Sequence, residues 1–422
     1  EGVGILDILS VYDLDGTDTA PGGIVALRNP ALATADQRPA RFLRIEKAVS
    51  IPDDEVRQVP GAAFGAAGAL GMREILGYAP IEPDGSVRIK VPADVAFAVS
   101  IVDRAGRRTS PRHLNWLQLR AGEVLTCNGC HRPAGLQPAG QPRISHGRPG
   151  LFARVNPGAP TTGQPFPNTR AALFADQGET MAQTRARISC QTDCAALTPS
   201  SDPKYEDVWT DPAAAGRPAD LPFAYRYADL ATPAPTSAAC TPRWSAQCRA
   251  TLHYPAHLAP LWNLPRPVLD AAGLPVLDGN GQPVDRNCQG CHSPRDAAGA
   301  VRVPAAQLDL SSTPSPEQSY QLTSYRELLF GDNAQQVDMG ALRDILVPGP
   351  IDPVTGQPTL VPVAVAASMS SSGAGASSRF FSRFDPGGTH AGFLTDAELR
   401  LIAEWLDIGG QYYNDPFTAP EN

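Results

Sequence analysis

Four of the eight cysteines stand in two copies of one short pattern. Residues 127–131 read CNGCH and residues 288–292 read CQGCH, so both copies have the form Cys-x-x-Cys-His. Two thiols at this spacing can bond to both vinyl groups of one porphyrin while the adjacent imidazole meets its iron. The sequence therefore predicts two covalently bound haem c groups. The predicted attachment and proximal residues are Cys127, Cys130, His131, Cys288, Cys291 and His292.

Two other kinds of site use the same cysteine pair. A zinc knuckle built from both copies and a thioredoxin-like redox pair are the alternatives. Neither explains why a histidine follows the second cysteine at the same offset twice.

Haem c is attached outside the cytoplasm, so we expect an exported protein of the periplasm or the extracellular space. The chain begins with Glu1 and shows no signal peptide, which we interpret as a segment removed or not included.

The sixth position of each haem iron separates two functions. A protein ligand there closes the iron to substrates and suits electron transfer, whereas an open position permits catalysis. For the second haem we predict His390 as the distal ligand, with Met369 as its rival. His390 follows Gly387 and Gly388, and glycines let a backbone approach a flat macrocycle closely. A helix that starts near Thr395 would hold this loop in place.

For the first haem two regions could supply the distal ligand, with an open position or a methionine as further alternatives. His146 lies in the loop that follows the first pentad and can swing back over the iron. His257 or His253 is the rival, because the two are four residues apart and would share one face of a helix. One of them could then bind iron while the other bonds a propionate. We expect His113 to be structural and to lie near the edge of the first haem.

The remaining cysteines are Cys190, Cys194, Cys240 and Cys248. They lack metal-type spacing with histidine, and in an exported protein they are predicted to form two disulfides. Three pairings exist. A pair one helical turn apart bridges poorly, which favours cross-links from the 190s segment to the 240s segment.

Composition and charge limit the function classes. The 422 residues include 43 Pro and 38 Gly but only 7% aromatic residues, which predicts a mixed, loop-rich fold with porphyrin as part of its core. A net charge of −8 argues against nucleic-acid binding. No apolar run approaches the ~18 residues of a membrane span.

Asp13, Asp15 and Asp18 around Gly16 form a candidate Ca²⁺ site, although a solvated turn is favoured.

Three regions can be recognised along the chain. Residues 1–125 are predicted to form a β-rich, sandwich-like antiparallel domain with strands near 86–91, 96–103 and 115–119. Residues 126–250 would be a first haem module with long loops and disulfides. Residues 251–422 would be a second, mainly α-helical c-type cytochrome domain. Its predicted helices are 324–330 and 395–408, the latter starting with a capping box of Thr395 and Glu398 and ending at Gly409.

Several longer segments carry a family resemblance. They are residues 71–78 (GMREILGY), 116–118 (WLQ), 253–262 (HYPAHLAPLW), 389–392 (THAG), 404–409 (EWLDIG) and 411–414 (QYYN). In these motifs the chain resembles hydrazine synthase alpha-subunit-like proteins. Because the motifs are spread along the sequence, the resemblance covers nearly the whole chain. The resemblance implies the diheme architecture, with a β-propeller often found upstream. The family's iron-ligating tyrosine, four residues after the first pentad, is replaced here by Gly135.

Two function classes follow. The favoured one is a diheme c-type cytochrome that passes single electrons between its irons and redox partner proteins or other haem subunits. The alternative is a haem-dependent oxidoreductase related to the hydrazine synthase alpha subunit, with an open first haem. Electron transfer is favoured over catalysis, and a homo-oligomer is compatible with either class. No hydrolase triad, phosphate loop or dinucleotide fingerprint is present.

Overall fold

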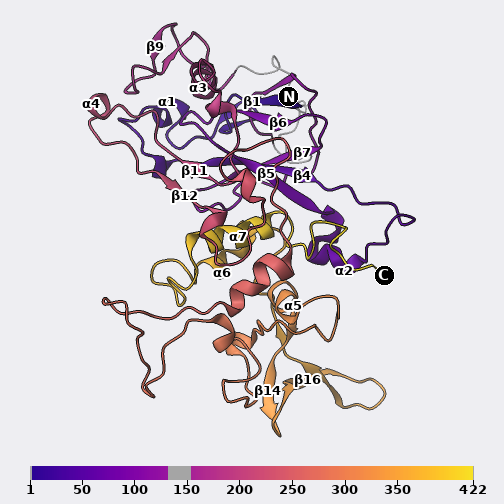
Figure 1. The fold of residues 1–422 in the computed structure, drawn as a ribbon. Coiled ribbons are helices and arrows are strands. Elements are labelled where there is room, and N and C mark those ends of the chain that lie inside the picture. Colours follow the sequence, from indigo (N-terminus) through magenta and orange to yellow (C-terminus); the bar gives the residue numbers. More distant parts are fainter. Residues whose placement is uncertain (1, 132–153, 422) are drawn as a thin grey trace. The chain divides into compact units, whose positions relative to one another are not determined.

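The computed structural model describes residues 2–131 and 154–421. It is mixed and loop-rich, with small sheets and short helices, as the composition predicts (Figure 1). The chain divides into two compact units, and each is described by itself. Unit 1 comprises Glu1–Ala48, Arg73–Ala228 and Thr236–Ala250, and unit 2 comprises Val49–Met72, Asp229–Pro235 and Thr251–Asn422.

Two three-stranded sheets form the centre of unit 1. The first sheet has the order β6-β1-β8, with strands Val87–Pro92, Val3–Ile8 and Val124–Cys127. The second has the order β5-β4-β7, with strands Arg73–Pro80, Phe42–Ala48 and Phe97–Val102. Apolar side chains from both sheets share one buried core, called the sandwich core below.

Alternating polarity explains β6. Its Val87, Ile89 and Val91 are buried, while Arg88 and Lys90 between them are half-buried, so one face of the strand enters the core. The predicted strands near 86–91 and 96–103 are therefore confirmed as β6 and β7.

Two strand predictions need correction. The run 115–119 contributes only one bridge, from Leu117 to Phe97. The strand that reaches the first pentad is β8 instead, and it pairs with β1 in parallel, so the sheet is not wholly antiparallel. A parallel pairing between the start of the chain and residue 124 depends on long-range packing, which leaves no local signal in the sequence.

Short hairpins and helices complete unit 1. Helix α3 (Met181–Ser189) begins with a capping box in which Thr180 and Gln183 bond each other's backbone. The other elements are β2 (Asp13–Leu14), β3 (Thr17–Asp18), α1 (Ile24–Leu27), β9 (Gln164–Pro165), β10 (Phe174–Ala175), β11 (Lys204–Tyr205), α4 (Pro212–Ala215) and β12 (Phe223–Ala224).

Both disulfides form within unit 1, between neighbours in sequence. The bonds are Cys190 to Cys194 and Cys240 to Cys248, so the predicted cross-links between the two segments are wrong. Helix α3 ends at Ser189, and Cys194 adopts a left-handed backbone with φ of 57°. The chain therefore turns back on itself, and the two Cα atoms lie 3.9 Å apart instead of one helical turn apart.

Unit 2 contains the two predicted helices. They are α5 (Thr323–Leu329) and α7 (Asp396–Asp407), and the expected capping box of Thr395 and Glu398 is present. Ile402 and Leu406 are fully buried. The other elements are α2 (Gly61–Phe64), β13 (Asp332–Asn333), β14 (Gln335–Asp338), β15 (Ala341–Asp344), β16 (Leu346–Ile351), β17 (Pro358–Pro362), β18 (Ala364–Val365) and α6 (Ser378–Phe381). None of the helices within the described ranges is long and apolar enough to cross a membrane.

Candidate functional site

The second pentad forms a single turn of helix in unit 2. The Asn287 side chain accepts hydrogen bonds from the backbone N–H groups of Gln289 (2.8 Å) and Gly290 (3.3 Å), which starts the turn. The N–H of His292 donates to the carbonyl of Cys288 over 2.9 Å. This compact turn brings both cysteines and the histidine of the pentad to one place, as attachment to a single porphyrin requires.

A cavity of about 480 Å³ opens beside this turn. It is lined by Cys288, Cys291 and His292 from the pentad and by the predicted distal ligand His390. This volume lies within the range of cofactor pockets. Much of the remaining wall is apolar, as a porphyrin face requires, and includes Trp262, Leu308, Leu310, Leu328, Phe330 and Phe393.

His292 and His390 line this cavity together. Their ring centres are 6.1 Å apart and the ring planes differ by 34°. A metal–imidazole bond is about 2.0–2.1 Å long and the ring centre lies roughly 1 Å further, so two imidazoles on opposite sides of one metal ion have centres about 6 Å apart. The residues present therefore fit a haem iron held between two histidines.

His390 is fixed from its backbone and its side chain. Its N–H donates to the carbonyl of Arg383 over 2.8 Å, and Phe384 and Phe393 contact its ring. Nδ1 lies 2.9 Å from the hydroxyl of Thr389. When Nδ1 carries the proton and donates it to this hydroxyl, the lone pair of Nε2 is available to a metal.

Electrostatics also favours neutral imidazoles in this cavity. Burial lowers the pKa of His390, and the Arg383 guanidinium lowers it further. Burial likewise lowers the pKa of His292, with a smaller effect from His390. Metal ligation requires the neutral ring, so both shifts act in the direction that ligation needs. The rival ligand Met369 is buried and is not among the residues that line this cavity.

The first pentad begins at the end of β8 in unit 1. Cys127 is buried in the sandwich core, and its carbonyl accepts a hydrogen bond from the N–H of Leu9. A Cβ atom on Gly129 would lie 2.3 Å from the carbonyl oxygen of Asp13, so only glycine fits this position of the pentad. The second pentad is less crowded, because a Cβ on Gly290 would meet no atom within 4 Å.

The predicted acidic turn lies directly against the first pentad. The N–H of Cys130 donates to the carbonyl of Asp13 (2.7 Å), and the N–H of Asp15 donates to the carbonyl of Cys130 (3.1 Å). Burial, followed by the charge of Asp13, raises the pKa of the Cys130 thiol to about 12. Asp18 accepts hydrogen bonds from the backbone of Ala20 and Ile24. Across the described part of the chain, no group of three or more His, Cys, Asp or Glu side chains is arranged to hold a metal ion.

His113, predicted to be structural and near the edge of the first haem, lies close to His131 of the first pentad. It is half-buried in unit 1, and burial lowers its pKa, with a further contribution from the nearby His131. The predicted ligand His146 lies outside the described residues.

His253 and His257 belong to unit 2, and their rings stack with centres 5.7 Å apart. His253 precedes the short π-helical turn Tyr254–Leu258 and His257 lies within its last turn, and the two share a face, as their spacing predicts. Nδ1 of His257 accepts the N–H of His253 (2.9 Å), and Nδ1 of His253 accepts the N–H of Asn414 (3.3 Å). Each neutral ring then carries its proton on Nε2. Iron ligation by either residue stays a prediction.

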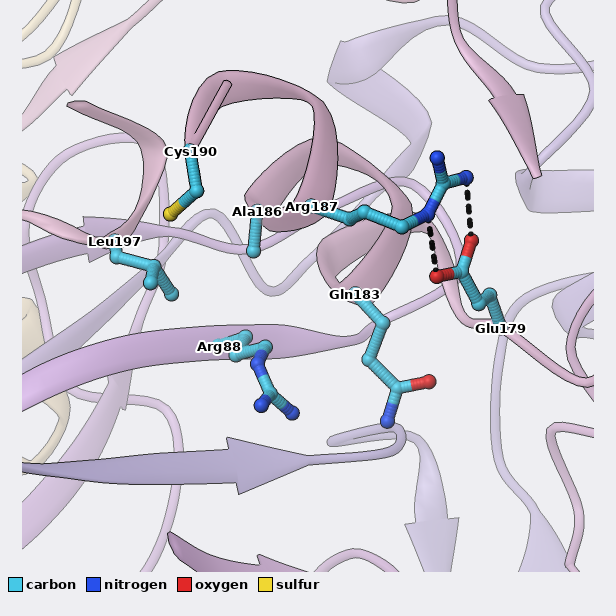
Figure 2. A pocket seen from close by; sticks show the side chains of 7 residues that line it. All are labelled: Arg88, Glu179, Gln183, Ala186, Arg187, Cys190 and Leu197. Atoms are coloured by element: carbon cyan, nitrogen blue, oxygen red, sulfur yellow. Dashed lines mark hydrogen bonds and ion pairs between the residues drawn. The ribbon is translucent and has the colours of Figure 1, made fainter. Parts of the chain in front are cut away.

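A second cavity of about 320 Å³ lies beside helix α3 in unit 1 (Figure 2). Arg187 forms an ion pair with Glu179, and Arg88 forms one with Asp7, so the charged side chains of this cavity are all paired. It is lined by no pentad residue, and the disulfide cysteine Cys190 is one of its lining residues.

Comparison with known proteins supports part of the resemblance. Residues 40–132 match the family described as hydrazine synthase alpha subunit middle domain. A solved structure of Kuenenia stuttgartiensis hydrazine synthase aligns at 15% identity with a TM-score of 0.34, covering 100% of this chain and 44% of that chain. The chain thus spans less than half the length of that chain, and no curated protein matches it. The predicted resemblance is confirmed for residues 40–132.

Proposed function

We propose that this chain is a diheme c-type cytochrome that transfers single electrons in the periplasm or outside the cell. The observation that carries the proposal is the pair of imidazoles from His292 and His390, 6.1 Å apart in a cavity that also exposes Cys288 and Cys291. An iron with two histidine ligands has no open position for a substrate, which suits electron transfer. External partners would be redox proteins or other haem subunits.

The second candidate is a haem-dependent oxidoreductase in which the first haem keeps an open position. The match of residues 40–132 to the hydrazine synthase alpha subunit middle domain favours it, because that segment includes the first pentad. In this function the second haem supplies electrons and the first haem binds a small substrate. The two candidates therefore share the second haem and differ only at the first.

Optical and EPR spectra of the isolated holoprotein, with and without CO, separate these functions. Two low-spin haems that do not bind CO support electron transfer. One low-spin haem together with one high-spin, CO-binding haem supports the oxidoreductase. Two high-spin haems, or a protein without covalent haem, would overturn both proposals. Fractionation of expressing cells tests the proposed location, since haem-loaded protein in the cytoplasm contradicts it.

A further inference from the structure

Two carboxyl groups line one wall of the cavity that holds His292 and His390, and a third lies beside them. Glu327 on α5 and Asp332 on β13 both line the cavity and hydrogen-bond through their side chains. The backbone N–H of Asp309 donates to Oε2 of Glu327 over 3.3 Å, which places the Asp309 carboxyl nearby. Two carboxyl groups that bond each other must share a proton, because two carboxylates repel.

The other charged groups of this cavity come from different segments. They are Asp285 and Arg286 before the pentad, Arg379 on α6, and Arg383 after it. The pKa of Glu327 is nevertheless raised mainly by burial and then by Asp332, not by these groups, and Asp309 adds a smaller repulsion. Together they raise the pKa of Glu327 to about 8. Burial also raises the pKa of Asp309. The proton on this carboxyl pair is thus exchangeable near neutral pH.

We propose that Glu327 and Asp332, once they have lost their shared proton, take one proton up again when the second haem gains one electron. This inference rests on the proposed function. In this step an external donor would lose one electron, the haem held at His292 and His390 would accept it, and water would release the proton that forms an O–H bond at the carboxyl pair. The physical cause is charge: reduction removes one positive charge from the cavity, so the carboxylate there becomes a stronger base. Electron uptake at the second haem would therefore be coupled to proton uptake at this carboxyl pair.

The test is the reduction potential of each haem against pH in the holoprotein, measured by spectroelectrochemistry. The two reduction transitions are assigned with the variant His390→Ala, because the transition whose potential it shifts belongs to the second haem. In wild type its potential should fall as pH rises through the region around pH 8, by up to ~59 mV for each tenfold change in proton concentration. Glu327→Gln should remove this slope and leave the haem count and low-spin spectrum unchanged. Glu317→Gln is the matched control, because Glu317 is an exposed glutamate of the same unit paired with Arg326.

An independent readout is the infrared difference spectrum between the oxidised and reduced protein. Wild type should gain a protonated-carboxyl band on reduction, and Glu327→Gln should lose it. If that variant does not fold, Asp332→Asn replaces it and should also weaken the slope. A wild-type potential independent of pH, or an unchanged slope in a folded Glu327→Gln protein, overturns the inference. These outcomes leave a low-spin second haem intact, so they differ from failure of the proposed function.

Discussion

His292 and His390 meet across one cavity although the first belongs to a haem pentad and the second to a distant loop before α7. Their ring centres are 6.1 Å apart. The capping box of Thr395 and Glu398 fixes the start of α7 six residues after His390. Glu398 also accepts two hydrogen bonds of 3.0 Å from Arg266. The loop that carries His390 is therefore anchored by a buried helix on its C-terminal side.

Replacement of His390 tests its assignment as distal ligand. His390→Ala should convert one haem to a high-spin form that binds CO, because the iron loses its sixth ligand. Both haems should stay attached, since the thioether bonds involve other residues. Thr389→Val is the control: it removes the hydroxyl beside Nδ1 and should keep a low-spin spectrum. An unaltered low-spin spectrum in His390→Ala would mean that another residue is the ligand.

The number of covalent haems gives a second prediction. Wild type should migrate in SDS as a peroxidase-staining band whose mass exceeds that of the polypeptide by two haems, because thioether bonds survive denaturation. Replacing Cys288 and Cys291 together by Ala should remove one haem and leave one. The same change at Cys127 and Cys130 should remove the other. Mass spectrometry of wild type with fewer than two haems would reject the diheme proposal.

Local signals in the sequence predicted local structure well. The helix 395–408 was predicted from one capping box and a terminal glycine, and α7 spans Asp396–Asp407. Such signals work because a capping interaction joins residues only three positions apart. The two strands near 86–91 and 96–103 follow from alternation and turn residues, which are also local.

Long-range geometry could not be predicted in the same way. The parallel pairing of β1 with β8 depends on how the two sheets of unit 1 pack together. The disulfide between Cys190 and Cys194 depends on one left-handed residue, which nothing in its side chain requires. His390 as the distal ligand of the second haem stays a prediction, which rests on two glycines, a capped helix and a haem motif that all indicate the same loop.

Acid should destabilise unit 2 through His257. Burial lowers the pKa of this residue to about 4, with a smaller effect from His253, whereas the unfolded residue has a pKa of about 6.5. Between these values the unfolded chain binds more protons, so stability falls as pH falls through this window. At pH ~4.5 the loss should be about 2–3 kcal/mol by this linkage.

His257→Gln should remove that part of the pH dependence while keeping an acceptor for the N–H of His253. Denaturant unfolding of both proteins at pH ~7 and pH ~4.5 gives the comparison. Equal losses of stability in wild type and variant would contradict the prediction. Loss of a low-spin haem signal in His257→Gln would instead identify this residue as an iron ligand.

The two disulfides should differ in their response to a reductant under native conditions. Cys190 is exposed at the end of α3, whereas Cys240 and Cys248 are only 9% and 2% exposed and pack with Trp244. Thiol–disulfide exchange requires access of the attacking thiolate to a sulfur atom, so the bond between Cys190 and Cys194 should be reduced first.

Alkylation of the folded protein followed by peptide mass spectrometry should label these two residues at low reductant, and label Cys240 and Cys248 only after unfolding. Without reductant, the unfolded protein should contain no free thiol. Simultaneous labelling of all four cysteines, or a peptide that joins the 190s segment to the 240s segment, would refute the observed pairing or its accessibility.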